Sequence, residues 1–223
     1  MIGTLNEGAL HAQLKDWCHR EGDRIEECVG GYVVDLVRED LLIEVQTAGF
    51  APLRGKLDRL LQTHCVRVVT PIALSRRIVR VSRDGVVLSS RRSPKAGRPE
   101  DVFDRLVSLP ALLAHPRFEV EVVLTHQDEV RMHSPGRAWR RGGWVVVGRS
   151  LTGVDGSLSI ASPADAAALL PAGLPDPFDT ADLAAAANID RRLAQQMAYC
   201  LRLAGALAPT GKRGNAALYQ LAV

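Results

Sequence analysis

The spacing of apolar positions changes several times along the first 70 residues. Residues 7–19 place apolar side chains at helical intervals, which predicts an amphipathic helix. Residues 32–37 and 42–46 are two short, mostly apolar runs on either side of the polar pair Glu39-Asp40. This part of the pattern predicts a β-hairpin with a two-residue turn.

The segment after the hairpin returns to helical spacing. Between residues 47 and 63, one apolar stripe is formed by Phe50, Leu53, Leu57, Leu60 and Leu61. Residues 65–70 are then predicted to form a strand that ends at Pro71. A strand, a long helix and another strand predict a crossover that brings the two strands together as parallel neighbours.

The middle of the chain is predicted to form one helix and four strands, at 102–114 and at 78–81, 86–89, 118–124 and 144–148. The first two of these strands flank Asp84-Gly85, a dipeptide that favours a hairpin turn. Residues 152–163 are rich in Gly, Ser and Pro, which indicates a linker. We therefore expect two domains, at 1–150 and 163–223, with few contacts between them.

The C-terminal part has the pattern of a helix, a turn, a second helix and a hairpin. These elements are predicted at 180–187 with Asp179 or Thr180 as the cap, at 188–190, at 191–203 and at 206–220. The order resembles the winged-helix domains of DNA-binding proteins. The resemblance implies DNA contacts from the second helix and the basic hairpin tip, through Arg191, Arg192, Gln195, Gln196, Lys212 and Arg213. Protein docking or dimerisation is the alternative role for such a module.

Composition limits the function classes. Of the 223 residues, 47% are hydrophobic and 24% charged, as in globular proteins. No stretch approaches the roughly 20 apolar residues of a membrane helix, and no secretory leader is visible, so we expect a cytoplasmic protein without a membrane partner. The four cysteines contain no CxxC pair, which argues against structural zinc and disulfides.

Charge is distributed unevenly along the chain. Residues 1–70 hold eleven acids and eight bases, a local charge of −3, whereas residues 76–98 hold eight bases and one acid, a local charge of +7. Arg140 and Arg141 belong to a second basic stretch without acids, at 131–149. An acidic beginning and a basic middle suit an enzyme that holds metal ions in one place and a polyanion such as DNA in another. Alternatively, the arginine-rich strands merely face solvent.

The hairpin at 32–46 brings two carboxylates together. With Glu39-Asp40 as the turn, Asp35 faces Glu44, and Gln46 lies on the same side of the sheet as Glu44. Two carboxylates at this spacing repel each other unless a cation lies between them. Mg²⁺ accepts a few carboxylate oxygens and completes its shell with water and substrate phosphate. The hairpin therefore predicts a metal site for phosphodiester hydrolysis, with a solvated acidic face as the simpler alternative.

The segment Gly31-Tyr-Val-Val-Asp35, followed by Glu44-Val-Gln46-Thr, a helix and a strand, resembles the PD-(D/E)XK nuclease superfamily over residues 5–75. The resemblance implies a restriction-endonuclease-like mixed sheet flanked by helices, beside a small α+β winged-helix domain. It also implies that Asp35 and Glu44 bind Mg²⁺ or Mn²⁺, with the Val45 carbonyl as a further ligand. Glu7 would supply an upstream acid, with Glu26 and Glu27 as alternatives.

The sequence departs from the family pattern at Gln46, where Lys is usual. Gln can orient a water molecule but offers no positive charge to the phosphate. Lys56 on the following helix either replaces the missing Lys or lies on a solvated face. The six histidines lack metal-binding spacing and are expected to be structural or exposed.

These patterns together predict a metal-dependent DNA endonuclease. A homodimer would suit the cutting of both strands. The alternatives are a DNA-binding regulator on a nuclease fold without catalysis, which the Gln46 departure favours, and an interaction module inside a larger complex.

Overall fold

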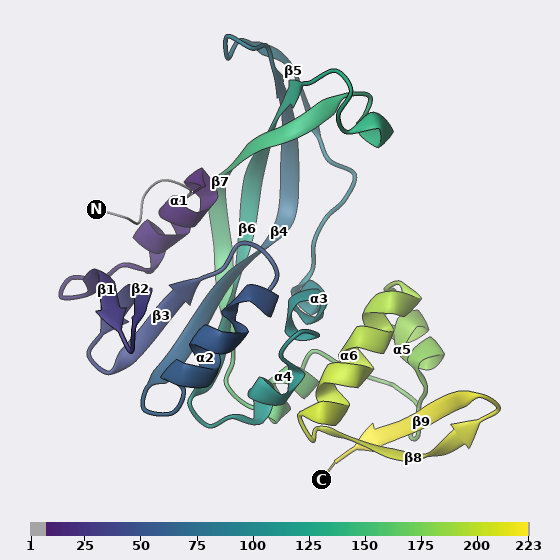
Figure 1. Cartoon of the computed structure of the whole chain (residues 1–223). Coiled ribbons are helices and arrows are strands. Elements are labelled where there is room, and N and C mark those ends of the chain that lie inside the picture. Colours follow the sequence, from purple (N-terminus) through teal and green to yellow (C-terminus); the bar gives the residue numbers. More distant parts are fainter. Residues whose placement is uncertain (1–7, 223) are drawn as a thin grey trace.

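The computed structural model describes residues 8–222, which form a mixed α/β structure with one large sheet flanked by helices (Figure 1). Glu7 lies outside the described residues. The strands of the large sheet are β1 (Arg24–Val29), β2 (Tyr32–Arg38), β3 (Leu41–Val45), β4 (Cys65–Val81), β5 (Val87–Arg92), β6 (Phe118–His133) and β7 (Trp144–Ile160). Their order is β1-β2-β3-β4-β6-β7, and β5 pairs with the C-terminal part of β4.

Short helices flank the sheet, and a smaller unit of helices and a hairpin follows it. The α-helices are α1 (Ala9–Cys18), α2 (Arg54–Leu60), α3 (Phe103–Leu106), α4 (Pro163–Ala167), α5 (Thr180–Ala187) and α6 (Arg191–Leu203). The 3-10 turns are η1 (Ala51–Leu53), η2 (Pro99–Val102), η3 (Pro110–Ala114) and η4 (Trp139–Arg141). The last two strands, β8 (Leu207–Arg213) and β9 (Ala216–Leu221), pair as a hairpin. None of the described helices is long and apolar enough to cross a membrane.

The predicted hairpin is confirmed as β2 and β3, with Arg38 opposite Leu41 and Leu36 opposite Ile43. The predicted crossover is also confirmed, because β3 lies parallel to β4. A strand that the sequence pattern did not indicate, β1, adds to the other side of β2. Its side chains are mostly exposed, so it lacks the apolar alternation by which a half-buried strand is recognised.

The prediction that a strand ends at Pro71 is wrong, because β4 continues to Val81. The Gln46 N–H donates to the Val69 carbonyl at 2.8 Å, so Val69 directs its hydrogen-bonding groups toward β3. Pro71, two residues later, directs its nitrogen to the same side, where β3 has already ended. A proline is tolerated in a strand where no partner needs its N–H.

The predicted long helices are shorter than expected. The segment 47–63 contains only η1 and α2, and the segment 102–114 is divided into the end of η2, the single turn α3 and the separate turn η3, which starts at Pro110. A proline inside a helix removes a hydrogen bond and clashes with the preceding turn. The apolar stripe itself is confirmed, because all five of its residues are buried in the main core: Phe50, Leu53, Leu57, Leu60 and Leu61.

The two faces of the sheet have different partners. Leu10 and Leu14 of α1 pack on one face against Ile43 and Val69. Helix α2, α3 and the C-terminal unit cover the other face.

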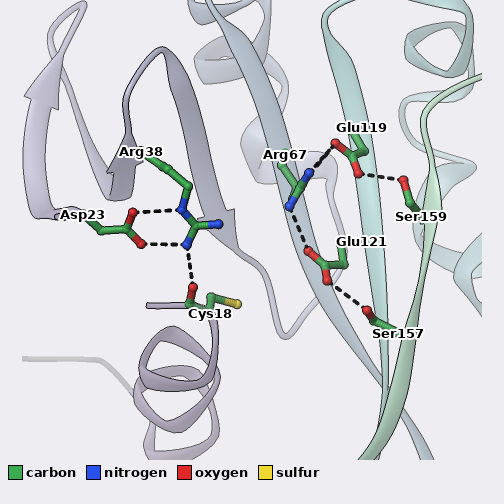
Figure 2. Close-up of polar contacts among 8 residues, drawn as sticks. All are labelled: Cys18, Asp23, Arg38, Arg67, Glu119, Glu121, Ser157 and Ser159. Carbon is green, nitrogen blue, oxygen red and sulfur yellow. Dashed lines mark hydrogen bonds and ion pairs between the residues drawn. The ribbon is translucent and has the colours of Figure 1, made fainter. Parts of the chain in front are cut away.

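The face that carries α1 continues beyond it as a polar ladder across β4, β6 and β7 (Figure 2). Arg67 donates to Glu119 at 3.0 Å and to Glu121 at 3.4 Å, and these two acids accept hydrogen bonds from Ser159 and Ser157. Every charged member of the ladder thus has an opposite charge beside it, which keeps a half-buried polar surface stable. We interpret the ladder as structural.

The prediction of a linker at 152–163 is wrong for most of its length. Residues 152–160 are the end of β7 and pair with β6. The small residues serve the strand: a Cβ on Gly153 would lie 3.3 Å from the His126 ring, so a larger side chain would crowd that ring. Glycine and serine therefore mark a bulged edge strand here rather than a free linker.

The expectation of few contacts between the two predicted domains is also wrong. Met197 and Leu201 of α6 are fully buried, and they belong to the same continuous core as Val68 and Val120 of the large sheet. Helix α6 packs against α3 and η3. The C-terminal unit therefore shares its hydrophobic core with the sheet.

Candidate functional site

Asp35 and Glu44 lie close together where the β2–β3 ladder ends. The last paired residues are Leu36 and Ile43, so the two strands separate at the carboxylates. Beyond that point, the Val45 N–H donates to Asp35 Oδ2 at 2.8 Å, and a side chain replaces the backbone acceptor of a regular ladder. Asp35 is only 16% exposed and Glu44 only 14% exposed, so neither forms a solvated acidic face.

Asp35 has a second partner that the sequence analysis missed. His11 Nε2, on α1, lies 3.3 Å from Asp35 Oδ2. His11 was expected to be structural or exposed, but its side chain lies beside a candidate metal ligand. The apolar stripe of α1 offers a signal for this position, because His11 lies three residues before the buried Leu14 and is therefore its neighbour on the helix surface.

Glu44 is paired with Lys56 of α2. Lys56 Nζ lies 2.5 Å from Glu44 Oε2 and donates to the Val33 carbonyl at 2.6 Å. The Lys56 side chain is 13% exposed, so the alternative of a solvated helix face is wrong. A short helix that packs its leucines on the sheet thus directs one lysine to the carboxylate pair.

The surroundings shift the pKa values of the two carboxyl groups in opposite directions. Burial alone would raise the pKa of Asp35, but hydrogen bonds from His11 and the Val45 N–H outweigh it, and the net shift lowers that pKa. Burial and the charge of Asp35 raise the pKa of Glu44 above its ordinary value, although Lys56 opposes this shift. A cation beside both carboxylates would offset the repulsion that acts on Glu44.

The chemistry of the donor atoms fits a hard divalent cation in part. Asp35 and Glu44 offer carboxylate oxygens, and the Val45 carbonyl faces the same side of β3 as its N–H, toward Asp35. Within residues 8–222, no group of three or more His, Cys, Asp or Glu side chains is arranged to hold a metal ion.

The proposed upstream acids do not complete this set among the described residues. Glu26 accepts a hydrogen bond from Lys15, and Glu27 accepts one from Arg24. Glu7, the first choice for this ligand, is outside the described part of the chain.

Gln46 lies just beyond the end of β3, and its side chain donates to the Gly49 carbonyl at 3.1 Å. Its own carbonyl accepts hydrogen bonds from Thr70 Oγ1 at 2.8 Å and from Arg105 Nη1 at 3.2 Å. Arg105 is a further residue that the sequence analysis missed. The structure therefore brings Lys56, and not Gln46, into hydrogen-bonding contact with Glu44.

The C-terminal unit presents a second candidate surface, between α6 and the β8–β9 hairpin. A groove of about 580 Å³ is lined there by residues that include Arg191, Gln195, Tyr199, Arg202 and Arg213. Gln196 is instead half-buried, and its Oε1 has no hydrogen-bond partner among the described residues.

The basic residues predicted to bind DNA differ in their partners. Arg192 donates to Asp104 of α3 at 2.8 Å, and Arg213 donates to Asp182 of α5 at 2.9 Å. Arg191 and Lys212 are exposed, and neither has an ion pair within residues 8–222. The last two are therefore the more available cations of this surface.

Arg140 and Arg141 lie far from the C-terminal unit, in the turn η4 between β6 and β7 at the opposite end of the long strands (Figure 1). Both are exposed, and Arg140 lies 5.0 Å from the centre of the Trp139 ring. The predicted basic residues thus occupy two separate surfaces.

A third polar cluster crosses the middle of the sheet. His126 Nδ1 lies 2.7 Å from Ser75 Oγ, and His126 Nε2 lies 2.7 Å from Asp155 Oδ1. The three residues lie on the neighbouring strands β4, β6 and β7, beside interruptions of the strand register. We interpret the Ser75–His126–Asp155 contacts as a cross-strand link that holds the bulges in place.

Comparison with known proteins places the chain in a family. The profile of a domain of unknown function, DUF8091, matches residues 8–161. The chain belongs to this family. An uncharacterized protein from Treponema pallidum (strain Nichols) is 31% identical over 221 residues, which cover 98% of this chain and 87% of that protein. No solved structure matches the chain.

Proposed function

We propose that the protein is a metal-dependent DNA endonuclease of the PD-(D/E)XK type. The observation that carries the proposal is the meeting of Asp35, Glu44 and Lys56 in one half-buried cluster. The order of elements supports it, because a hairpin, a short helix and a parallel strand follow one another along the chain. Two carboxylates and a lysine are side chains suited to holding a metal ion and a negatively charged phosphate.

In this proposal, Asp35, Glu44 and the Val45 carbonyl would hold Mg²⁺ or Mn²⁺, which would supply an activated water for hydrolysis of a phosphodiester bond. Lys56 keeps its ammonium beside Glu44, where it would stabilise negative charge on the phosphate. The positive charge missing at Gln46 would then come from α2. His11 would orient the Asp35 carboxylate through its hydrogen bond.

The C-terminal unit would bind DNA as a winged helix. Its order is α4, a single bridge between Phe178 and Tyr219, α5, α6 and the β8–β9 hairpin. This order supports the assignment of α6 as the recognition helix and the hairpin as the wing. Arg191 and Lys212 would make the main phosphate contacts.

A DNA-binding protein without cleavage is the second candidate. Gln46 favours this function, as does the finding that no group of three or more His, Cys, Asp or Glu side chains within the described residues is arranged to hold a metal ion. Both candidates predict DNA binding, so only cleavage and metal binding separate them.

The deciding experiment titrates Mg²⁺ or Mn²⁺ into the protein with plasmid, duplex and single-stranded substrates. Asp35→Asn and Glu44→Gln should each abolish cleavage and keep DNA binding, because these residues hold the cation and not the duplex. Asp40→Asn is the matched control, since Asp40 is an exposed carboxylate in the turn of the same hairpin. No cleavage by the wild type and no carboxylate-dependent metal binding by calorimetry would leave the second candidate.

A further inference from the structure

A cavity of about 620 Å³ lies where the sheet meets α3 and the start of α6. Its lining includes Thr47, Lys95, Arg105, Arg149 and Asp190. Thr47 is the third residue after Glu44 and lies just beyond the end of β3. The volume lies within the range of pockets that hold small ligands.

One wall of this cavity is a segment pressed against β4. The Gly97 N–H donates to the Ala73 carbonyl at 2.8 Å. A Cβ at Gly97 would lie 2.7 Å from that carbonyl oxygen, so any larger residue would push the segment away from the strand. This contact fixes the backbone that carries Lys95 beside the cavity.

A second wall is formed by Arg76 and Arg149, and both pair with Glu129, which they share with Arg131 outside the lining. Arg76, Arg131 and Arg149 lie 3.6, 2.6 and 3.1 Å from Glu129, which is 3% exposed. Three positive charges therefore share one negative charge. The Nε of Arg76, a lining residue, is buried and has no hydrogen-bond partner among the described residues. A buried donor without a partner is costly unless a ligand or water satisfies it.

Arg105 forms a third wall and contacts only neutral oxygens in its hydrogen bonds. It donates to the Pro71 carbonyl at 2.8 Å, to the Gln46 carbonyl and to the Thr70 hydroxyl. Burial and the charge of Arg149 lower the pKa of Arg105 to about 10. The two guanidinium groups thus repel each other, although the charges of Asp101 and Asp104 oppose this shift.

The acidic residues of the lining are already engaged elsewhere. Asp190 caps α6 by accepting from the Leu193 N–H, and Asp101 accepts from the Arg98 N–H. Asp104 accepts from Arg192. The lining therefore holds four basic side chains against three carboxylates, and one of these carboxylates is paired with Arg192 outside the lining. The start of α6 adds the positive end of a helix dipole.

We propose that this cavity binds the phosphomonoester group of a nucleotide, either free or at the end of a nucleic acid strand. Arginine forks match the oxygens of a phosphate, and a dianion would balance the excess of positive charge. The cavity also has room for more than the phosphate alone. The strand-end source rests on the proposed nuclease function, whereas the free nucleotide does not.

The test measures binding of deoxyadenosine monophosphate to the full chain by calorimetry, at low salt and with EDTA present. The wild type should bind the monophosphate and should not bind deoxyadenosine. Arg149→Met and Lys95→Met should each weaken binding at least fivefold, and together at least twentyfold. Arg83→Met removes the same charge from an exposed turn outside the cavity and should leave binding unchanged. Arg105 is avoided, since its loss would remove a donor from the Pro71 and Gln46 carbonyls and from the Thr70 hydroxyl.

A second measurement separates the two sources of the phosphate. If strand ends bind, oligonucleotides with a 5′- or 3′-phosphate should bind more tightly than the same oligonucleotides with hydroxyl ends, and Arg149→Met should remove the difference. Binding of the free nucleotide without such a preference would assign the site to a small molecule. The proposal is overturned if the wild type does not bind the monophosphate, or if Arg83→Met weakens binding as much as Arg149→Met. Glu44→Gln should keep the phosphate site, so failure of the nuclease proposal would be seen separately.

Discussion

The carboxylate hairpin and the C-terminal unit differ in how far along the chain their defining contacts reach. In the C-terminal unit, the predicted helices match α5 and α6, because Asp179 and Asp190 cap them locally. In the hairpin, the strands were also predicted, but the side chains that complete the cluster are His11 and Lys56, which come from α1 and α2.

The difference lies in the range of the interactions that define each part. Caps, turns and apolar stripes act within a few residues, so the sequence shows them directly. The partners of a buried charge depend on which helix face meets which strand, and that is set by packing. The comparison therefore predicts that the two parts will also differ in how mutations affect them.

The largest expected effect concerns the core that joins the two parts. Met197→Ala should lower the free energy of unfolding by about 2–5 kcal/mol, because the fully buried side chain packs in the core that also includes the sheet. Leu203→Ala is the control on the same helix, since Leu203 is 40% exposed. Urea denaturation followed by fluorescence and circular dichroism should show one shared transition. Two transitions, of which only one moves, would mean that the two parts unfold independently.

The next effect separates Lys56 from Gln46 in the hairpin cluster. Lys56→Gln should lower the cleavage rate about a hundredfold, because it removes the charge beside Glu44. Gln46→Ala should lower the rate less than tenfold, since its side chain contacts the Gly49 carbonyl. Gln46→Lys should preserve or raise the rate. Single-turnover cleavage measures all three, and a larger loss in Gln46→Ala than in Lys56→Gln would reverse the assignment.

A smaller effect distinguishes the cations of the C-terminal unit. Arg191→Ala with Lys212→Ala should weaken duplex binding about tenfold, or ~1.4 kcal/mol, and reduce its salt dependence. Arg192→Ala with Arg213→Ala removes the same charge from residues already paired with Asp104 and Asp182, and should weaken binding less. Equal affinity for the wild type and the first pair would favour the docking alternative.

The smallest effect is a difference in pH dependence between the two carboxylates without metal. Glu44 has a raised pKa, so its ionisation costs stability as the pH rises, and Glu44→Gln should be more stable than the wild type at neutral pH. Asp35 has a lowered pKa, so its ionised form contributes stability that is lost as the pH falls through that pKa, and Asp35→Asn should be less stable at neutral pH.

Thermal unfolding between pH 3 and 7 measures the stability of each variant relative to the wild type. Both stability differences should become smaller as the pH falls. Added Mg²⁺ should stabilise the wild type and not Glu44→Gln, since a ligand stabilises only the protein that binds it. A loss of stability in Glu44→Gln at neutral pH would contradict the repulsion between the two carboxylates.

The sequence by itself determined the elements whose causes are local. Helix α6 begins after Asp190 and ends before Gly205. The stripe from Phe50 to Leu61 marks the buried side of α2, and Glu39-Asp40 forms the turn between β2 and β3. Each of these features is set by neighbours within about two helical turns or one hairpin, so one chain read in order is enough.

The tertiary structure alone decided the length of β4, the fate of the glycine-rich segment and the partners of the charges. Pro71 continues a strand because β3 has ended beside it, and residues 152–160 pair with β6 rather than forming a linker. The sequence alone is compatible with Lys56 on a solvent-facing side of its helix, and only the packing of α2 directs its side chain to Glu44. These outcomes depend on contacts between distant segments, whose free energy no local pattern contains.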